Sequence, residues 1–284
     1  MTWFVVDPLT RRSWGLPLPG ERPGRDGALR KRVEGRVVVI TGASSGIGRA
    51  AALRLGAAGA HVVLVARNAD ELGQVASDIE VDGGIADVAP CDLSHPDSVD
   101  ALIEALDGNA EILINNAGKS IRRKVSKSAD RPHDFERTMQ LNFHGALRLT
   151  LGVLPGMRER RRGHIVNVSS MGVQFAAPRF AAYVASKAAL DAFARVSATE
   201  LKRDRIAFTT VHLPLVRTPM IEPTRAYDRV PALSPENAAG WICEAICSRS
   251  RVVDYPVGPV GEALHAVAPG VTERAMHRVF RVGV

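Results

Sequence analysis

The sequence has few cysteines and no long apolar run, and these absences exclude two classes of protein. Its three cysteines, Cys91, Cys243 and Cys247, are too few for a disulfide framework and suit a reducing compartment. No run of about 18 apolar residues is present, so we expect no transmembrane helix. The N-terminus lacks the basic lead-in and small-residue cleavage site of a secretory signal. We therefore expect a cytoplasmic protein.

Patterns typical of metal and nucleic-acid binding are also lacking. Cys243 and Cys247 stand four apart on a predicted helix without further Cys or His ligands nearby, so we interpret them as packing residues and predict no metal site. The formal net charge of +7 favours an anionic partner. No zinc-finger, helix-turn-helix or aromatic-interleaved pattern accompanies the basic clusters, which argues against nucleic acid. Anionic lipids and phosphorylated small molecules remain as candidates.

The chain of 284 residues, 46% of them hydrophobic, is long enough for one large domain. Residues 1–33 are rich in Pro, Gly and Arg and show no sustained period, which predicts an N-terminal arm. From residue 34 to residue 284 we expect a single domain. No internal repeat or low-complexity segment interrupts it.

Short apolar runs alternate with longer helical patterns from Arg36 onward. Apolar runs without polar alternation are typical of strands buried on both faces, as in a parallel sheet. The predicted strands include residues 37–40, 62–65, 112–114, 165–166 and 208–213, and the predicted helices are residues 47–58, 70–81, 97–106, 135–162 and 181–202. Strands and helices in turn predict a doubly wound α/β fold of Rossmann type, with helices on both faces of a parallel sheet.

The first predicted strand leads into a glycine-rich turn, Thr41-Gly42-Ala43-Ser44-Ser45-Gly46-Ile47-Gly48, and then into an Ala-rich helix. Glycines here let the backbone turn tightly and approach a ligand, and the helix N-terminus offers free N–H groups to a pyrophosphate. The spacing, G-x-x-x-G-x-G, differs from the commoner G-x-G-x-x-G, but the same mechanics apply. We therefore predict a dinucleotide site, with a purely structural turn as the alternative.

The end of the second strand bears on the choice of nucleotide. A dinucleotide site commonly has an acid here that holds the ribose 2′-hydroxyl. Ala66 takes the place of that acid and Arg67 follows it, and a guanidinium suits a 2′-phosphate. We therefore predict NADP(H) over NAD(H). The alternative is that Arg67 is a solvated loop residue.

Polar and small residues also follow the third and fourth strands, where a doubly wound sheet binds its ligands. Asp92 and Leu93 close the third strand, and Asp92 either caps the next helix or accepts a hydrogen bond from the adenine amino group. The run Asn115-Asn116-Ala117-Gly118 closes the fourth strand.

Farther along the chain, Tyr183 and Lys187 stand four apart in an Ala-rich helical pattern, and Ser170 precedes Tyr183 by thirteen positions. Residues four apart share a helix face. A tyrosine, with a pKa of about 10, is a poor acid or base near neutrality, but a neighbouring ammonium lowers that pKa. A serine hydroxyl could hold the oxygen that reacts. Taken alone, such a Tyr–Lys pair is usually a surface pair.

Together these motifs resemble those of the short-chain dehydrogenase/reductase family. The matching pieces are the glycine turn, Asn115-Asn116-Ala117-Gly118, Asn142 in Leu-Asn-Phe-His-Gly, Ser170, and Tyr183-x-x-x-Lys187. The resemblance covers residues 35–220 and implies a single domain with a Rossmann-type sheet of about seven parallel strands. It also implies a homodimer or homotetramer.

The resemblance implies roles as well. Tyr183 would exchange a proton with the substrate oxygen, and Lys187 would lower the Tyr183 pKa and hold the nicotinamide ribose. Ser170, rather than Ser169, would polarise the substrate carbonyl, and Asn142 would tie a water into a proton relay to Lys187. The nucleotide would be bound by Gly42, Ser44, Ser45, Gly46, Ile47, Gly48, Arg67, Asp92, Leu93, Asn116, Ala117, Gly118, Tyr183, Lys187, Val216 and Thr218. The family usually has glycine where this chain has Leu215.

Several stretches, among them residues 120–123, 211–221 and 261–269, look like bacterial fatty acyl-CoA reductases of this superfamily. This implies NADPH-dependent reduction of a long-chain fatty acyl-CoA to a fatty aldehyde. Residues 219–284 would then supply a Pro-rich lid and a substrate-side segment. An amphipathic helix over residues 262–282 would wall the acyl pocket, pack against its own domain or a sister subunit, or lie on a membrane surface. The cluster Arg122-Arg123-Lys124 would attract coenzyme A phosphates or be a solvated loop.

Two other functions use the same residues. An oxidoreductase for a ketone or secondary alcohol, such as a sterol, polyketide or xenobiotic, needs the same Asn142, Ser170, Tyr183 and Lys187. A non-catalytic NADP-binding sensor would keep the fold without turnover. Such sensors typically lose part of the Ser-Tyr-Lys set, which is complete in this chain.

Overall fold

A computed structural model describes residues 26–222, 224, 227, 230–255 and 257–282. Over this part of the chain the strands form one seven-stranded sheet in the order β3-β2-β1-β4-β5-β6-β7, and every neighbouring pair is parallel. The strands are β1 Val37–Thr41, β2 His61–Ala66, β3 Ile85–Pro90, β4 Ile112–Asn115, β5 Gly163–Ser170, β6 Ile206–Leu213 and β7 Val252–Val253. The sheet grows outward from β1 in both directions, which confirms the predicted doubly wound fold.

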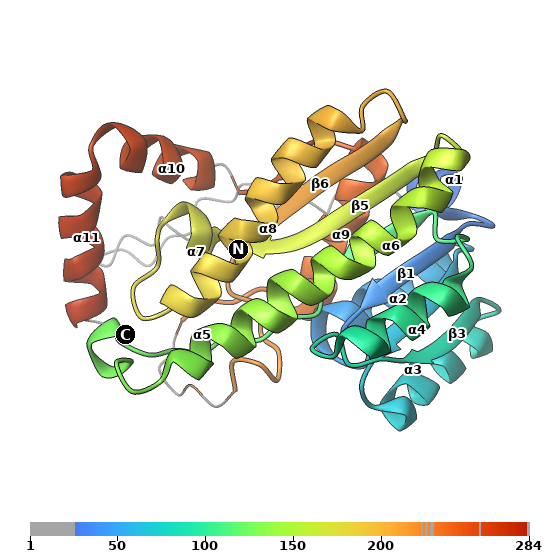
Figure 1. The fold of residues 1–284 in the computed structure, drawn as a ribbon, viewed down its shortest axis with the longest axis horizontal. Coiled ribbons are helices and arrows are strands. Elements are labelled where there is room, and N and C mark those ends of the chain that lie inside the picture. Colours follow the sequence, from blue (N-terminus) through green and yellow to red (C-terminus); the bar gives the residue numbers. More distant parts are fainter. Residues whose placement is uncertain (1–25, 223, 225–226, 228–229, 256, 283–284) are drawn as a thin grey trace.

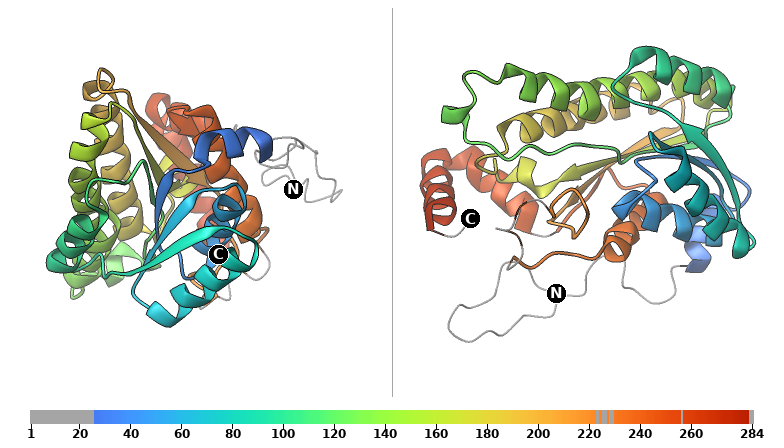
Figure 2. Two further views of the ribbon diagram at one scale, coloured as in Figure 1. Left: turned by 90° about the vertical axis from the view of Figure 1, so that its right-hand side faces the viewer. Right: turned by 90° about the horizontal axis from the view of Figure 1, so that it is seen from below.

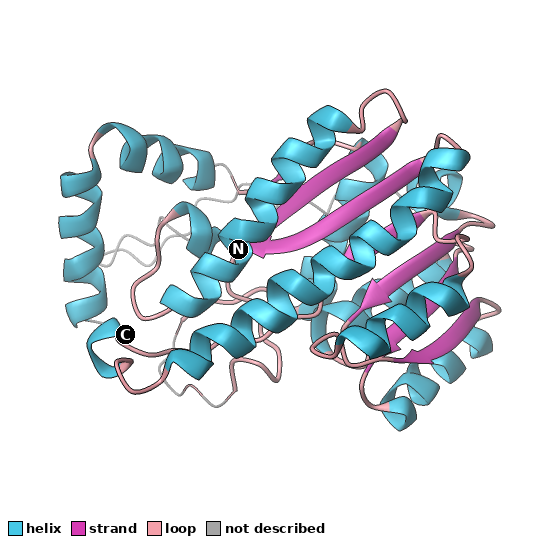
Figure 3. Cartoon of the chain, in the orientation of Figure 1, coloured by secondary structure: helices cyan, strands magenta, loops and turns pink. Residues whose placement is uncertain are grey.

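Helices cover both faces of the sheet (Figures 1, 2 and 3). One face is covered by α1 Asp26–Val33, α2 Gly46–Ala57, α3 Ala69–Val81 and α9 Pro235–Ser248, and the other by α4 Pro96–Leu106, α6 Ala146–Glu159 and α8 Ala181–Glu200. The smaller elements are η1 Val125–Lys127, α5 Pro132–Met139, the π-helical η2 Gln140–Gly145 and α7 Met171–Gln174. The single helix predicted over residues 135–162 is thus α5, η2 and α6 in succession.

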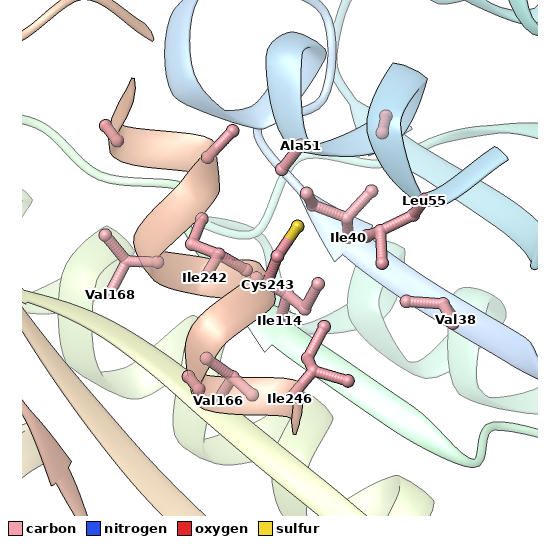
Figure 4. Close-up of a cluster of buried hydrophobic side chains, with 14 of the residues drawn as sticks. Val38, Ile40, Ala51, Leu55, Ile114, Val166, Val168, Ile242, Cys243 and Ile246 are labelled. Atoms are coloured by element: carbon pink, nitrogen blue, oxygen red, sulfur yellow. The ribbon is translucent and has the colours of Figure 1, made fainter. Parts of the chain in front are cut away.

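Each central strand contributes side chains to two hydrophobic cores, as its continuous apolar run predicts. In β1, Val38 and Ile40 belong to the core beneath α2 and α9, whereas Val39 belongs to the core beneath α4 and α6. Figure 4 shows the first of these cores, where Ile242 and Cys243 of α9 meet the strands. The prediction that Cys243 is a packing residue is therefore confirmed.

Helix α1 lies within the predicted N-terminal arm. Its Leu29 and Val33 are 2% and 0% exposed and belong to the core that α9 also lines. Residues 26–33 are therefore packed against the domain, because two apolar side chains four apart suffice to attach one face of a short helix. Residues 1–25 lie outside the described residues.

The C-terminal segment forms two helices, α10 Val257–Val267 and α11 Pro269–Val282, which lie beyond the carboxyl ends of the strands (Figure 1). The prediction of one helix over residues 262–282 was therefore wrong. Pro269 is the reason, since proline is tolerated in the first turn of a helix but not in its interior. Leu264, Val267 and Val271 are exposed, and the membrane or subunit contact predicted for this segment stays a prediction. No described helix is both long and apolar enough to cross a bilayer.

Trp241 tests the packing of α9. It is fully buried and stacks on Tyr255, with ring centroids 6.4 Å apart, while its Nε1 has no hydrogen-bond partner among the described residues. Trp241→Ala should lower the free energy of unfolding by ~3–5 kcal/mol because it leaves a large cavity. Trp241→Phe should cost much less, since it removes an unpaired donor and keeps an aromatic ring. Equal losses for the two variants in urea denaturation would contradict this account.

Candidate active site

A cavity of about 1440 Å³ opens at the carboxyl ends of the strands. Its walls come from the loops after β1, β2, β3 and β4, from the end of β5, from α8, and from the segment after β6. In a doubly wound sheet this edge, beside the first strand, is where ligands bind. The cavity is therefore the candidate active site.

The glycine turn brings the N-terminus of α2 to this cavity. Ser45 is the N-cap residue, but its side chain makes no capping hydrogen bond, and no acidic side chain lies in the first turn of the helix. The first N–H groups of α2 and the positive end of its dipole are therefore open to an anion. Gly42 and Gly46 have φ angles of 68° and 52°, which suit glycine far better than other residues.

A second set of contacts ties the ends of β1 and β4 together. Thr41 Oγ1 donates to the Ile114 carbonyl at 3.2 Å and accepts from the backbone N–H groups of Asn116 and Ala117, each at 3.0 Å. The Asn116 side chain donates back to the Thr41 carbonyl at 2.9 Å. These contacts position the glycine turn and the Asn115–Gly118 loop side by side on the cavity wall.

Ser170, Tyr183 and Lys187 also line the cavity, from β5 and α8. The Ser170 hydroxyl caps α7 by accepting from the Gly172 N–H at 3.0 Å, and it hydrogen-bonds with Tyr183. Lys187 Nζ donates to the Val168 carbonyl at 2.7 Å. The three residues that the family resemblance singled out therefore lie on the same cavity.

Burial decides the pKa values of the Tyr–Lys pair. It raises the pKa of Tyr183 to about 12, against the lowering effect of the Ser170 hydrogen bond, and the Asp191 carboxylate and the Tyr227 phenol add to the rise. Burial also lowers the pKa of Lys187 to about 8, against the opposing effect of Asp191. The lowering effect of Lys187 on the Tyr183 pKa stays a prediction, since burial is the largest effect and the net shift is upward. Near neutral pH Tyr183 keeps its proton, as a proton donor must.

Asn142 is fully buried in the π-helical turn η2 and does not line the cavity. Its Oδ1 accepts from the Lys119 N–H at 2.8 Å, and its Nδ2 donates to the Lys119 carbonyl and to Ser186 Oγ, each at 2.9 Å. Its side chain thus fixes the backbone next to Gly118 and the helix residue before Lys187. The water relay expected of Asn142 stays a prediction.

Of the other predicted site residues, only Gly48 does not line the cavity. Those that line it are Gly42, Ser44, Ser45, Gly46, Ile47, Arg67, Asp92, Leu93, Asn116, Ala117, Gly118, Ser170, Tyr183, Lys187, Val216 and Thr218. Asp92 Oδ1 accepts from the Ser94 N–H at 2.9 Å, whereas the N-cap of α4 is His95. Helix capping, one of the two alternatives for Asp92, is therefore excluded.

The basic cluster after the Asn115–Gly118 loop divides into three roles. Arg122 lines the cavity. Arg123 Nε donates to the buried Asp134 carboxylate at 3.0 Å, so its charge is already paired. Lys124 is exposed. A role of this cluster in attracting phosphate stays a prediction, because Arg123, Arg131 and Arg137 share the one Asp134 carboxylate and leave a net positive charge there.

The sequence motifs missed the apolar far wall of the cavity. Phe175, Phe180, Tyr227 and Met276 line it, and Phe180 stacks on Tyr227 with ring centroids 6.5 Å apart. These side chains come from three separate segments and follow no motif. The signal that could have located part of the wall is the Pro-rich connection after residue 219, which predicted a lid.

The fold and this cavity define an oxidoreductase with a Rossmann-type nucleotide-binding sheet. Residues 36–228 match the family described as short chain dehydrogenase. The chain therefore belongs to the short-chain dehydrogenase/reductase family, which confirms the resemblance seen in its motifs.

Individual relatives show which members of this family the chain is similar to. The chain is 52% identical over 260 residues to an uncharacterized oxidoreductase of Mycobacterium tuberculosis, covering 89% of this chain and 76% of that protein. It is 50% identical over 257 residues to a fatty acyl-CoA reductase of Acinetobacter baylyi, covering 89% and 87%. A metagenomic short-chain oxidoreductase solved in complex with NADP is 30% identical, with a TM-score of 0.67, covering 79% of this chain and 97% of that one. The resemblance to bacterial fatty acyl-CoA reductases is thus confirmed.

Gly48 provides a test of the glycine turn as a nucleotide-binding site. A Cβ at Gly48 would lie 2.0 Å from the Gly42 carbonyl oxygen and 2.7 Å from Asn116 Nδ2. Gly48→Ala should therefore displace the turn and weaken binding of a nicotinamide dinucleotide roughly tenfold or more. Gly73→Ala is the matched control, since Gly73 is also helical but has nothing within 4 Å of its added Cβ. Unchanged binding by Gly48→Ala in fluorescence titration would contradict the assignment.

Proposed function

We propose that this protein is an NADPH-dependent reductase of long-chain fatty acyl-CoA, which it converts to fatty aldehyde and free coenzyme A. The observation that carries the proposal is that one cavity is lined both by the open N-terminus of α2 and by an apolar wall. Ser170, Tyr183 and Lys187 lie on the same cavity. The similarity to a bacterial fatty acyl-CoA reductase supports the choice of substrate.

The nucleotide would be held by the residues at the strand ends. The uncapped first turn of α2 fits a pyrophosphate, because its N–H groups have no side-chain acceptor and no acid opposes the charge. Arg67 follows β2, is exposed and lines the cavity, so its guanidinium is accessible to a 2′-phosphate. Asn116, Ala117, Gly118, Val216 and Thr218 would complete the site. When bound, the nucleotide supplies the hydride.

The side chains of this chain supply the proton and the geometry. The Ser170 hydroxyl would donate a hydrogen bond to the substrate carbonyl oxygen, and Tyr183 would protonate that oxygen as the carbonyl carbon is reduced. Lys187 would place a positive charge beside the phenolate that results, which stabilises it. Burial keeps Tyr183 protonated near neutral pH, so the phenol is in the form that can donate a proton.

A thioester substrate needs one further step. Reduction of the carbonyl gives a thiohemiacetal, whose C–S bond then breaks to release the aldehyde and a thiol. The overall change consumes one NADPH and one proton for each thioester. The apolar wall built from Phe175, Phe180 and Met276 would bury the acyl chain, at about 0.8 kcal/mol for each methylene removed from water.

A ketone or secondary-alcohol oxidoreductase is the second candidate. Both reactions use the same motif residues, so these residues do not separate the two candidates. A non-catalytic NADP-binding sensor is the third candidate. The complete Ser170, Tyr183 and Lys187 set on the cavity argues against it.

Arg67 tests the choice of nucleotide. Arg67→Ala should raise the KM for NADPH roughly 10- to 100-fold, because a charge-assisted hydrogen bond to the 2′-phosphate is lost. The KM for NADH should change little. Arg148→Ala is a matched control, since Arg148 pairs with Asp100 and does not line the cavity. Equal effects of Arg67→Ala on both nucleotides would contradict the proposed NADP preference.

The substrate class is tested by a panel of acyl-CoA thioesters, fatty aldehydes and simple ketones. We expect NADPH consumption with long-chain acyl-CoA to be matched by release of one thiol per NADPH, measured with a chromogenic thiol reagent. Ketone reduction without thiol release from any acyl-CoA would favour the second candidate instead.

Tyr183→Phe serves as the control for turnover in this panel. It should lower kcat by roughly 10²- to 10⁴-fold, the typical contribution of a positioned proton donor. Binding of NADPH should remain, because the helix N-terminus and Arg67 are untouched. Surviving turnover would show that another group donates the proton.

A further inference from the structure

A second layer of buried polar side chains adjoins the Ser–Tyr–Lys group, and one of its members, Ser169, also lines the cavity. Ser169, Asp191 and His212 are 3%, 7% and 7% exposed and come from β5, α8 and β6. Ser169 and His212 are direct neighbours in the register of β5 and β6, so their side chains share one face of the sheet. None of the three belongs to the motifs that identify the family.

Hydrogen bonds join this layer around the Asp191 carboxylate. Asp191 Oδ2 accepts from Ser169 Oγ at 3.1 Å and is 2.9 Å from His212 Nε2. His212 Nδ1 is 3.9 Å from Asp254 Oδ2, which accepts from Gln174 Nε2 at 3.1 Å. The histidine contacts the carboxylate and not the serine, so the layer has no base for a serine nucleophile. Ser169 and His212 instead hold the Asp191 carboxylate in place.

That charge lies one helical turn from Lys187. Lys187 and Asp191 are four apart on α8 and therefore share a face. Lys187 Nζ is bonded to the carbonyl of Val168, and Asp191 is bonded to the next residue of β5, Ser169. Among the described residues no carboxylate lies within 4.0 Å of Lys187, so Asp191 acts on it through space.

The free-energy cost of burying the Lys187 ammonium explains why a carboxylate is needed near it. Lys187 is 3% exposed, and an ammonium taken out of water loses its charge unless an opposite charge is near. Asp191 raises the pKa of Lys187 against the burial that lowers it to about 8. The other titratable groups around the pair are Tyr183 on α8, His212 on β6 and Asp254 after β7.

We propose that Asp191 is a positioning residue whose buried carboxylate keeps Lys187 in its charged ammonium form beside Tyr183. Ser169 and His212 fix the carboxylate, and Asp254 and Gln174 connect this layer to α7 and the end of β7. The assignment rests on the proposed function only where turnover is measured, because the charge of Lys187 is measurable without substrate.

The decisive experiment is an NMR titration of the Lys187 side chain in protein carrying ¹³Cε-labelled lysine, with the resonance assigned from Lys187→Arg. Asp191→Asn should lower the midpoint of the Lys187 titration by about one pH unit or more, since an opposite charge is removed. In the same variant, the alkaline loss of reductase activity should begin at a correspondingly lower pH.

Three variants separate charge from packing. Asp191→Glu keeps the charge and should restore most of the midpoint. Ser169→Ala removes one hydrogen bond but no charge, and Asp254→Asn removes a carboxylate that does not contact Asp191, so both should shift the midpoint far less. Asp191→Ser provides a second neutral variant where Asp191→Asn does not fold.

A midpoint unchanged in both neutral variants, with only the melting temperature lowered, would show that Asp191 is structural and would overturn the proposal. The titration is independent of the substrate panel. A protein that reduces no acyl-CoA, but whose Lys187 midpoint falls in Asp191→Asn, would contradict the proposed function and leave the role of Asp191 standing.

Discussion

Three consecutive residues at the end of β5 are bonded to three residues on one face of α8, and the geometry of the site depends on this attachment. The contacts join Val168 to Lys187, Ser169 to Asp191 and Ser170 to Tyr183. The helix residues are spaced by four, so they share one face, while successive strand residues supply a carbonyl and two hydroxyls. Because three such contacts join the strand to the helix, the Tyr183 phenol and the Lys187 ammonium have little freedom to move.

The attachment also explains why these groups are buried. Contact with a strand inside the sheet removes water from Lys187 and part of the water from Tyr183, which lines the cavity, and this loss moves both pKa values toward the uncharged forms. For the phenol this suits proton donation. For the ammonium it is a cost, which the charge of Asp191 offsets. This is the physical reason for the positioning role proposed for Asp191, whose carboxylate opposes the loss of the lysine charge.

The sequence predicted those features that depend on local residues. The strands follow from continuous apolar runs, and the glycine turn follows from close backbone approach, as Gly48 against Gly42 shows. Features that depend on tertiary contacts were missed or mistaken. The direction of the Tyr183 pKa shift depends on burial, which the spacing of Tyr183 and Lys187 does not contain. The split of the C-terminal segment was readable from Pro269, but the apolar periodicity across it suggested one helix.

The choice of substrate depends on the far wall of the cavity. In the proposed mechanism Ser170, Tyr183 and Lys187 would act on any carbonyl placed between them and a nicotinamide, so they do not separate a thioester from a ketone. Met276 of α11 and Phe175 after α7 both line the cavity, and the two helices are linked through α10. A change in the C-terminal helices would therefore alter the room for an acyl chain without moving the Ser–Tyr–Lys group. Substrate range in this fold can change by this route while the chemistry stays the same.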